Sequence, residues 1–432
     1  MKLFSLLFLL SIAVASLVAA GTSLSYDGYQ VFRVKTGTKM ASVQQKLRGI
    51  KFDEWNSVRN KHIDIAVSPD QIDRFKKLNL DYHVMHKDLS KSISAESAAN
   101  HVWKRQVDDL SWYNSYHPYE DHKAYFKALH EAFPNNSKLV SSGTSHEGRE
   151  IFGIHFWGAN GPGQPAVLWH GTVHAREWIV APVLEYLTLQ LIKGYGVDNT
   201  TTGFVDKYDF WVFPFVNPDG FVYTQTTERL WRKNRQPAPQ ATNSTCYGRD
   251  INRNWPYKWD ANPLGASTDP CSQTYKGAEP ADTPEMQGLH KLVDQLRDSS
   301  GLKLYIDWHS YSQYFLAPVG FNCTYYVPTL GQHIALAQIA SDAIREVEGV
   351  TFTYGPSCAT LYPTTGGSFD YAYAIGKADW SYLIELRDTG DYGFILPAQQ
   401  IKGSAAEQWE GVKMMLSLLD ETFFDGAGEA AL

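Results

Sequence analysis

The sequence predicts an α/β fold, a mixed, mostly parallel sheet with helices on both faces, preceded by a small α+β domain. In the longer, second part of the chain, short continuous apolar runs alternate with segments of helical periodicity, as in sheets buried on both faces. A shorter stretch ahead of it has strand and helix patterns of its own. The 432 residues, 44% apolar and 20% charged, are enough for a large core with an added module.

Residues 1–20 predict a secretory signal peptide. Lys2 supplies the positively charged start, residues 3–18 form an apolar run, and Ala19-Ala20 offers small residues for cleavage. The alternative is a membrane anchor, but the run is short for a full span and no later stretch resembles a second one. We therefore expect a secreted, extracellular protein, free of the membrane after signal cleavage, with a vacuolar or lumenal location as the alternative.

Residues 21–105 predict the small α+β module and its linker. Strand-like patterns cover residues 29–34 and 63–67, and helix-like patterns cover residues 42–47 and 68–78. The linker is rich in Ser and Ala and ends near the dibasic pair Lys104-Arg105. A surface turn with two solvated charges would look the same, but the position between two modules favours cleavage there by an activating protease.

Residues 106–432 predict the large domain. Its apolar, strand-like runs are residues 166–169, 210–216, 304–308 and 382–386. A helical stretch follows the first run as far as Ile192, and a last helix is expected around residues 405–419. Active sites of open α/β sheets lie at the carboxyl ends of strands, so each run's end is a place to look for chemistry.

Charge and cysteine content narrow the class of function. The net charge of −7, without a basic block, gives no reason to expect nucleic-acid binding. The 4 cysteines, in an oxidising compartment, favour two disulfides, and pairing Cys246 with Cys271 and Cys323 with Cys358 closes the shortest loops, although three connectivities are possible. Sequons that predict a glycoprotein begin at Asn135, Asn199, Asn243 and Asn322.

Two candidate zinc ligands follow the first large-domain strand. His174 and Glu177 are spaced i, i+3 and can point the same way, and an imidazole and a carboxylate suit Zn²⁺. The pattern alone is weak, since a surface His with a solvated Glu would look alike, and His170 is a further candidate. A catalytic zinc needs a third protein ligand, and His309 at the end of run 304–308 is the best choice, although it also fits a core histidine.

Longer motifs resemble the zinc metallocarboxypeptidases of the carboxypeptidase A/B type. The resemblance begins with His174-Ala175-Arg176-Glu177-Trp178 and His309-Ser310-Tyr311-Ser312. It continues in the family's order through Asn217-Pro218-Asp219-Gly220, Arg229-Leu230-Trp231-Arg232-Lys233, Asn252-Arg253-Asn254-Trp255, Gly366-Gly367-Ser368 and Glu385-Leu386-Arg387-Asp388-Thr389-Gly390. Together the blocks span residues 112–410, and the segment ahead of them is similar, more loosely, to the family's inhibitory pro-segment. The resemblance implies a carboxypeptidase-like catalytic domain over 106–432 and a pro-segment over 21–105.

The resemblance also implies the catalytic residues. One Zn²⁺ per chain would be held by His174, Glu177 and His309, with Asp250 behind His174. Glu385 matches the family's general base, and a carboxylate inside an apolar strand needs a partner or a role, the alternative being a buried ion pair with an Arg. Arg232 would stabilise the oxyanion.

Further matches concern the substrate. Asn252 and Arg253 match the pair that binds the terminal carboxylate, and Tyr362 matches the tyrosine that closes over it. Arg176 matches a substrate-contacting arginine, and Tyr311 and Phe394 match residues of the next subsite. The Cys246–Cys271 and Cys323–Cys358 pairs also match disulfides found in the family.

The terminal-residue pocket decides which residue such enzymes remove. Phe369 matches the deciding floor position, where relatives that remove basic residues have Asp, and Leu383 lies on the wall. The remaining pocket candidates are likewise uncharged: Leu316, Gly320, Ser357, Leu361 and Thr364. A buried Lys without a partner is unfavourable, so an apolar terminal residue is expected. Phe is larger than the usual residue, and Asp379 follows an apparent one-residue insertion that leaves its distance from the pocket open.

The function predicted is that of a secreted zymogen of a zinc carboxypeptidase. It would act, as a monomer, on the C-termini of peptides and proteins after cleavage near Lys104-Arg105, and would prefer apolar terminal residues. Three alternatives remain open on the sequence. They are a basic-residue-specific carboxypeptidase, a non-catalytic peptide-binding relative, and a latent protein whose pro-segment stays attached.

Overall fold

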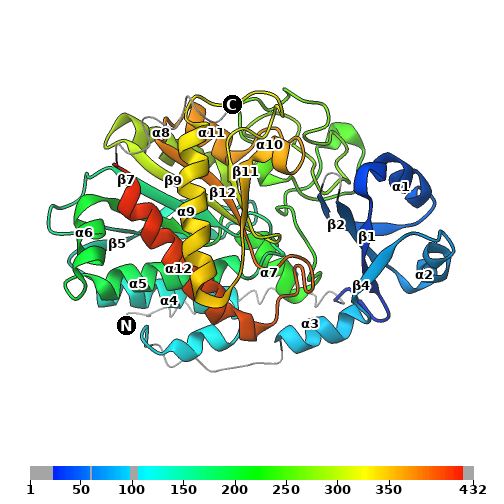
Figure 1. The fold of residues 1–432 in the computed structure, drawn as a ribbon, viewed down its shortest axis with the longest axis horizontal. Coiled ribbons are helices and arrows are strands. Elements are labelled where there is room, and N and C mark those ends of the chain that lie inside the picture. The colour runs from blue at the N-terminus through cyan, green and yellow to red at the C-terminus, as the bar shows by residue number, and fades with distance from the viewer. Residues whose placement is uncertain (1–22, 59–60, 98–105, 422–432) are drawn as a thin grey trace, which may run out of the picture.

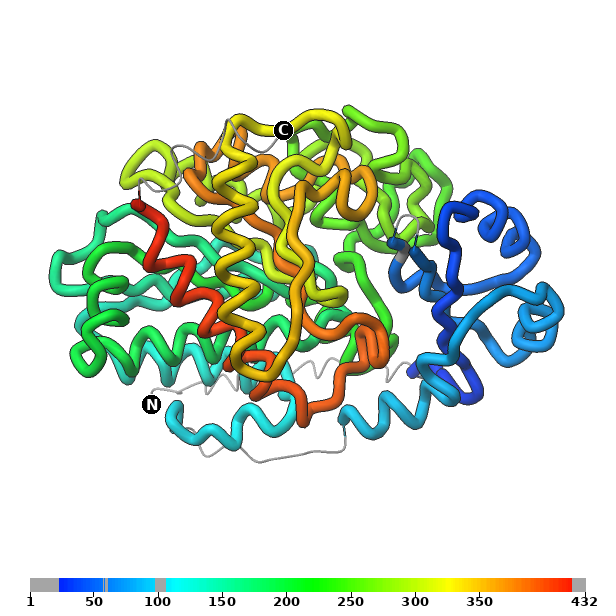
Figure 2. The backbone as a smooth tube through the Cα atoms, in the orientation of Figure 1, coloured from blue at the N-terminus to red at the C-terminus, as the bar shows by residue number. Residues whose placement is uncertain are grey.

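The computed structural model describes residues 23–58, 61–97 and 106–421, which form two sheets with helices of their own (Figure 1). The predicted signal peptide, the Lys104-Arg105 pair and the last eleven residues, 422–432, lie outside the described residues. Figure 2 shows the small N-terminal domain at one end of the molecule, beside the large domain. None of the helices in the described part of the chain combines the length and the apolar character that a membrane span requires.

The small domain is an antiparallel four-stranded sheet with the strand order β2-β3-β1-β4. Its elements are β1 (Gln30–Lys35), α1 (Met40–Leu47), β2 (Phe52–Val58), β3 (His62–Val67), α2 (Pro69–Lys76) and β4 (Tyr82–His86). Both helices pack on the sheet through a small core that includes Phe32, Leu47 and Phe75. The predicted strands β1 and β3 are thereby confirmed, whereas β2 and β4 escaped prediction. Both are edge strands with exposed polar residues, so their sequences lack a continuous apolar run.

The large domain is built on a mixed eight-stranded sheet with the order β11-β10-β12-β9-β7-β8-β6-β5. Its strands are β5 (Ser137–Thr144), β6 (Glu150–Phe156), β7 (Ala166–Gly171), β8 (Asp209–Phe213), β9 (Leu302–Ser310), β10 (Tyr314–Ala317), β11 (Thr353–Pro356) and β12 (Trp380–Leu386). The central strands β12, β9, β7 and β8 are parallel to one another, and antiparallel pairings join β10 to β12 and β6 to β8. The four apolar runs of the sequence are these central strands, and the mixed sheet is confirmed.

Helices cover both faces of this sheet, as predicted. They are α4 (Tyr119–Ala132), α5 (Val180–Gly194), α6 (Asn199–Lys207), α7 (Pro218–Thr226), α8 (Pro284–Asp298), α9 (Leu330–Glu348), α10 (Ser357–Thr360), α11 (Ser368–Ala374) and α12 (Ile401–Leu418). Successive strand residues point to opposite faces, so Val167 and Trp169 join the core under α4, α5, α9 and α12. Ala166 and Leu168 join the second core, under α8 and α11. Figure 1 shows α9 and α12 crossing the near face together.

Shorter elements connect these parts. The helix α3 (Leu89–Ser97) leads away from the small domain (Figure 1). Single 3-10 turns occur at Gly37–Lys39, Leu110–Asn114, Gln240–Thr242, Ile251–Arg253 and Ala398–Gln400. Two disulfides, Cys246–Cys271 and Cys323–Cys358, fasten loops of the large domain, which confirms the predicted pairing.

The parallel strands β7, β9 and β12 end at the same edge of the sheet. His174 and Glu177 follow β7, while His309 and Glu385 lie opposite each other near the ends of β9 and β12. The sheet therefore gathers at one edge the residues that the sequence analysis singled out.

Candidate active site

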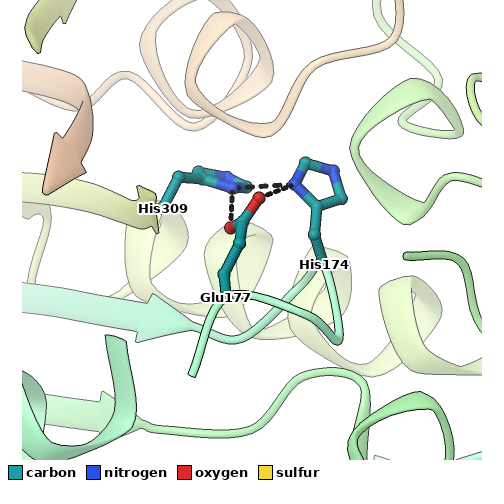
Figure 3. A group of neighbouring side chains, drawn as sticks. All are labelled: His174, Glu177 and His309. Atoms are coloured by element: carbon teal, nitrogen blue, oxygen red, sulfur yellow. Dashed lines mark hydrogen bonds and ion pairs between the residues drawn. The ribbon is translucent and has the colours of Figure 1, made fainter. Parts of the chain in front are cut away.

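His174, Glu177 and His309 converge on one point (Figure 3). One ligand atom from each lies within 4.8 Å of the others, and all three side chains are buried. The Nδ1 atom of His174 is 2.8 Å from Oε1 of Glu177, and the Nδ1 atom of His309 is 2.9 Å from Oε2 of the same carboxylate. Figure 3 shows both rings turning this nitrogen toward the carboxylate. His170, the other candidate, is not part of the group; it is fully buried behind it, beside Tyr305.

The outer nitrogen of each ring faces a buried carboxylate. Nε2 of His174 lies 3.1 Å from Oδ1 of Asp250, and Nε2 of His309 lies 2.9 Å from Oδ1 of Asp307. A carboxylate at Nε2 draws the ring proton to that nitrogen and leaves Nδ1 with a lone pair. Three groups that can only accept then face one another: the two Nδ1 atoms, 3.0 Å apart, and the Glu177 carboxylate. A cation such as Zn²⁺ can bind all three at once. The residues present therefore fit zinc.

The charges around this site are arranged to keep its carboxylates ionised. Although burial opposes it, positive charge on His174 and His309 holds the pKa of Glu177 well below its usual value, a charge that a bound cation would supply instead. Burial also opposes ionisation of Asp250, but Arg232 and then His174 hold the pKa of that carboxyl well below its usual value. Anionic ligands and backing groups of this kind favour a divalent cation.

Glu385 has a different environment. It lines the same cavity as His174, Arg232 and His309, and its Oε2 atom has no hydrogen-bond partner among the described residues. Burial raises its pKa above the usual value, and His309 opposes that shift. A carboxyl group with a raised pKa and a free oxygen beside a metal site is suited to taking up and returning a proton.

Two arginines supply fixed positive charge next to the metal site. Arg232 donates from Nη2 to Oδ2 of Asp250 at 2.8 Å and lines the cavity. Arg176 is buried with its guanidinium 4.0 Å from the centre of the Phe394 ring. Burial, and next the charge of Arg232, lower the pKa of Arg176 to about 10, so that both side chains remain cations at neutral pH.

The predicted carboxylate-binding residues Asn252, Arg253 and Tyr362 line the same cavity. The Asn252 side chain is fixed at both ends, since Nδ2 donates to Oδ2 of Asp307 at 3.0 Å and Oδ1 accepts from the backbone N–H of Ser368 at 2.9 Å. Arg253 donates from Nη1 to the Asn252 carbonyl at 2.9 Å, whereas its buried Nε has no partner among the described residues.

Part of the cavity wall is uncharged. Phe369 contributes to it together with Leu383, Leu316, Ser357, Leu361 and Thr364. The acid next to Phe369, Asp370, directs both carboxylate oxygens to the backbone N–H of Gly320, at 3.1 and 2.9 Å. The open question about Asp379 is answered by its ion pair with Lys303 at 2.8 Å, in a separate depression lined by Leu419 and Asp420.

Tyr311 and Phe394 lie outside this cavity, in contact with the small domain. The Tyr311 hydroxyl donates to Oδ2 of Asp64 at 2.6 Å, and the Phe394 ring centre is 5.4 Å from that of Trp55. They share a hydrophobic cluster with Trp55. Their place near the metal site is therefore covered in this form of the molecule.

The small domain also borders the cleft itself. Strand β2 brings Asp53, Glu54 and Trp55 to a depression whose other walls include Arg176 and Arg232. The Trp55 carbonyl accepts from Nη2 of Arg176 at 3.4 Å. The sequence analysis missed these contacts, because β2 was not recognised as a strand and nothing in its composition points to the cleft.

Comparisons with known proteins agree with this geometry. Residues 122–411 match the family described as zinc carboxypeptidase, and residues 33–96 match the carboxypeptidase activation peptide. The chain is 42% identical over 415 residues to metallocarboxypeptidase A of Trichophyton tonsurans, covering 94% of this chain and 97% of that protein. It is 36% identical over 315 residues to carboxypeptidase B of Astacus astacus, covering 73% of this chain and 100% of that protein.

Solved structures show the same likeness. The crystal structure of thrombin activatable fibrinolysis inhibitor (TAFI) superposes with a TM-score of 0.82 at 25% identity, covering 90% of this chain and 98% of that one. The carboxypeptidase A from Helicoverpa armigera superposes with a TM-score of 0.79 at 26% identity, covering 94% of this chain and 99% of that one.

Proposed function

The chain belongs to the zinc carboxypeptidase family, and from this membership we propose that it is the secreted precursor of an enzyme that removes apolar residues from the C-termini of peptides and proteins. It is a metallocarboxypeptidase with a His174, Glu177 and His309 zinc triad and an activation peptide, whose removal by cleavage is implied. The proposal concerns its terminal-residue preference, the roles of the other site residues, its location and its state as a monomer.

One observation carries the proposal. One cavity is lined by the metal-site residues His174 and His309, by Glu385, by Asn252 and Arg253, and by the uncharged Phe369 and Leu383. A guanidinium and an amide beside the reacting centre can bind a free carboxylate, which restricts cleavage to the last residue of a chain.

The reaction follows from the positions of these side chains. His174, Glu177 and His309 would hold the zinc, which would supply a Lewis acid for activating water near neutral pH. Glu385 takes the proton of the attacking water and returns it to the leaving amine. Arg232 stabilises the negative charge that the carbonyl oxygen gains, Arg176 contacts the substrate, and Tyr362 covers the bound end.

The uncharged pocket supports the preference for apolar terminal residues. The relative from Trichophyton tonsurans bears the name metallocarboxypeptidase A, whereas the more distant one from Astacus astacus bears the name carboxypeptidase B. In this chain Phe369 stands on the pocket floor, and Asp370 is turned to the backbone of Gly320. A terminal Lys would have to bury its ammonium without an anion, which is unfavourable.

The proposed secretion and activation rest on two sequence features, the apolar run at the N-terminus and the dibasic pair between the two domains. The apolar run 3–18 with Ala19-Ala20 supports a signal peptide, and two disulfides suit an oxidising compartment. The pair Lys104-Arg105 follows α3 and precedes the large domain, so cleavage there separates the activation peptide from the enzyme.

The test uses the processed enzyme and a set of peptides that differ only in the last residue. We expect release of Leu, Met, Phe or Tyr, loss of activity on chelation, and recovery with added zinc. In Phe369→Asp the preference should shift toward Lys and Arg, because the new carboxylate lies on the pocket floor. The matched control is Asp379→Asn, which changes a surface acid and should leave the preference unchanged.

Faster release of Lys or Arg than of apolar residues by the unaltered enzyme would contradict the proposed preference. Equal cleavage of peptides with free and amidated C-termini would contradict the roles of Asn252 and Arg253.

A further inference from the structure

Asp307 lies at a junction that the zinc site and the substrate site share. It stands in β9 two residues before His309, so both side chains emerge on the same face of the strand. Its Oδ1 atom is 2.9 Å from Nε2 of His309, a charge contact without hydrogen-bond alignment, and Nδ2 of Asn252 lies 3.1 Å from the same nitrogen. Its Oδ2 atom accepts from Nδ2 of Asn252 at 3.0 Å and from the Ser368 hydroxyl.

The carboxylate is held from behind by a second buried pair. Nδ1 of His170 is 3.4 Å from Oδ1 of Asp307, and Nε2 of His170 is 2.5 Å from the Tyr305 hydroxyl. His170, Tyr305 and Asp307 are all fully buried. A buried carboxylate with four polar neighbours on two sides has one stable orientation, so each neighbour is positioned by the others.

We propose that Asp307 is a positioning residue that couples the third zinc ligand, His309, to the terminal-carboxylate site at Asn252. One oxygen fixes the imidazole whose other nitrogen binds zinc, and the second oxygen fixes the amide that meets the substrate. Ser368 extends the connection to α11, which carries Phe369 on the pocket floor. The coupling rests on the proposed role of Asn252 in binding the terminal carboxylate.

Two carboxylates thus contact the zinc-binding histidines, and each also contacts a different part of the substrate site. Asp250 pairs with His174 and with Arg232, on the side where the oxyanion develops. Asp307 pairs with His309 and with Asn252, on the side where the terminal carboxylate binds. Losing a carboxylate behind a metal-binding histidine typically lowers metal affinity or activity by about 10- to 100-fold.

The test is Asp307→Asn. An amide has one acceptor oxygen, so it cannot face His309 and Asn252 with an acceptor at the same time. We expect zinc affinity of the full-length precursor, measured by competition with a chelator, to fall by about 10- to 100-fold. We also expect a shifted visible spectrum of the cobalt-substituted protein. After processing, KM for peptides should rise by more than kcat changes.

Glu285→Gln is the matched control, because Glu285 is as buried as Asp307 and accepts from His146 and Asn234 away from the zinc site. It should leave the zinc affinity, the cobalt spectrum and KM unchanged. Ser368→Ala is a milder second variant that removes one donor to Asp307 and should raise KM and weaken zinc in the same direction. It keeps the test open if Asp307→Asn does not fold.

Unchanged zinc affinity or unchanged KM in the folded variant, or in Ser368→Ala where the first does not fold, overturns the coupling. If instead the proposed function is wrong, the unaltered enzyme will cleave peptides with free and amidated C-termini equally, so the two failures can be told apart.

Discussion

Two carboxylates on neighbouring strands of the sheet have opposite surroundings. Asp307 on β9 accepts on Oδ2 from Asn252 and Ser368 and has the His309 ring 2.9 Å from Oδ1, and although burial opposes it, His309 and His170 lower its pKa. Glu385 on β12 keeps one oxygen without a partner, and burial raises its pKa. Two carboxyl groups whose pKa values are driven apart take different roles, one as a fixed anion and one as a proton carrier.

Replacing Glu385 with Gln tests the second of these roles. The amide keeps the shape of the side chain but cannot accept and return a proton, so turnover of the processed enzyme should fall by roughly 10²- to 10⁴-fold. Zinc content should stay at one per chain, because Glu385 is not part of the triad. Metal analysis and steady-state kinetics on the same sample make the comparison, and near-normal turnover would contradict the assignment.

At the scale of elements, one wall of the terminal-residue pocket depends on a disulfide. Cys358 lies within α10, and Ser357 and Leu361, on either side, line the pocket ahead of Tyr362. The Cys323–Cys358 bridge ties this short helix to the loop after β10. A single helical turn has little stability of its own, so its position comes from this tether and from its contacts.

Removing that bridge with Cys323→Ser and Cys358→Ser should therefore affect both stability and substrate binding. We expect a loss of about 2–4 kcal/mol of unfolding free energy, together with a higher KM and a weaker preference among apolar terminal residues. The Cys246–Cys271 bridge joins residues 25 apart in sequence, and the Cys323–Cys358 bridge joins residues 35 apart. Removing Cys246–Cys271 should therefore lower the free energy of unfolding by a similar amount but leave the preference among terminal residues intact. Thermal unfolding and the peptide set measure the two effects, and equal preferences in both variants would contradict a role for the tether.

The central strands were predictable from sequence and the outer ones were not. Strands β7, β9 and β12 are apolar runs because both faces of the sheet are covered there, whereas β5 and β2 alternate with exposed polar residues and have no such signal. The zinc triad was recognised from motifs rather than from spacing, since His309 is far from His174 in sequence. Asp307 was missed, although the argument applied to Glu385, a carboxylate within an apolar strand, marks it equally well.

At the scale of the whole molecule, the small domain and α3 are held to the catalytic domain by buried polar contacts. The Tyr311 hydroxyl donates to Asp64, Arg33 donates to the Thr389 carbonyl, and Asn56 donates to the Ser312 hydroxyl at 2.8 Å. None of these contacts follows from local sequence patterns, because each joins residues from two domains. They place β2 next to the cleft, which accounts for the covered state of the precursor.

A buried, bidentate ion pair between the activation segment and the enzyme lies outside the cleft. Glu96 of α3 accepts from Nε of Arg229 at 2.7 Å and from Nη2 at 2.8 Å, and both side chains are buried. Arg229 also donates to the carbonyls of Arg176 and Phe394 and lies 3.8 Å from the Trp178 ring centre. This pair therefore connects the end of the activation segment with the frame of the substrate cleft.

Replacing Glu96 with Gln leaves a buried guanidinium without its anion, but only while the activation segment is docked. Breaking a buried pair from one side costs about 3–5 kcal/mol, and the lower end applies because Arg229 keeps two carbonyl partners. Docking should weaken by roughly 100-fold, so the intact precursor should hydrolyse a small peptide measurably and its linker should be cut faster by added protease.

Lys91→Gln on the same helix removes only a largely exposed charge and should change neither rate. The processed enzyme should be equally active from all three precursors, because residue 96 precedes the expected cleavage site. If the Glu96→Gln precursor is inactive and its linker is cut no faster than that of the unaltered precursor, the contacts at β2 alone hold the activation segment in place.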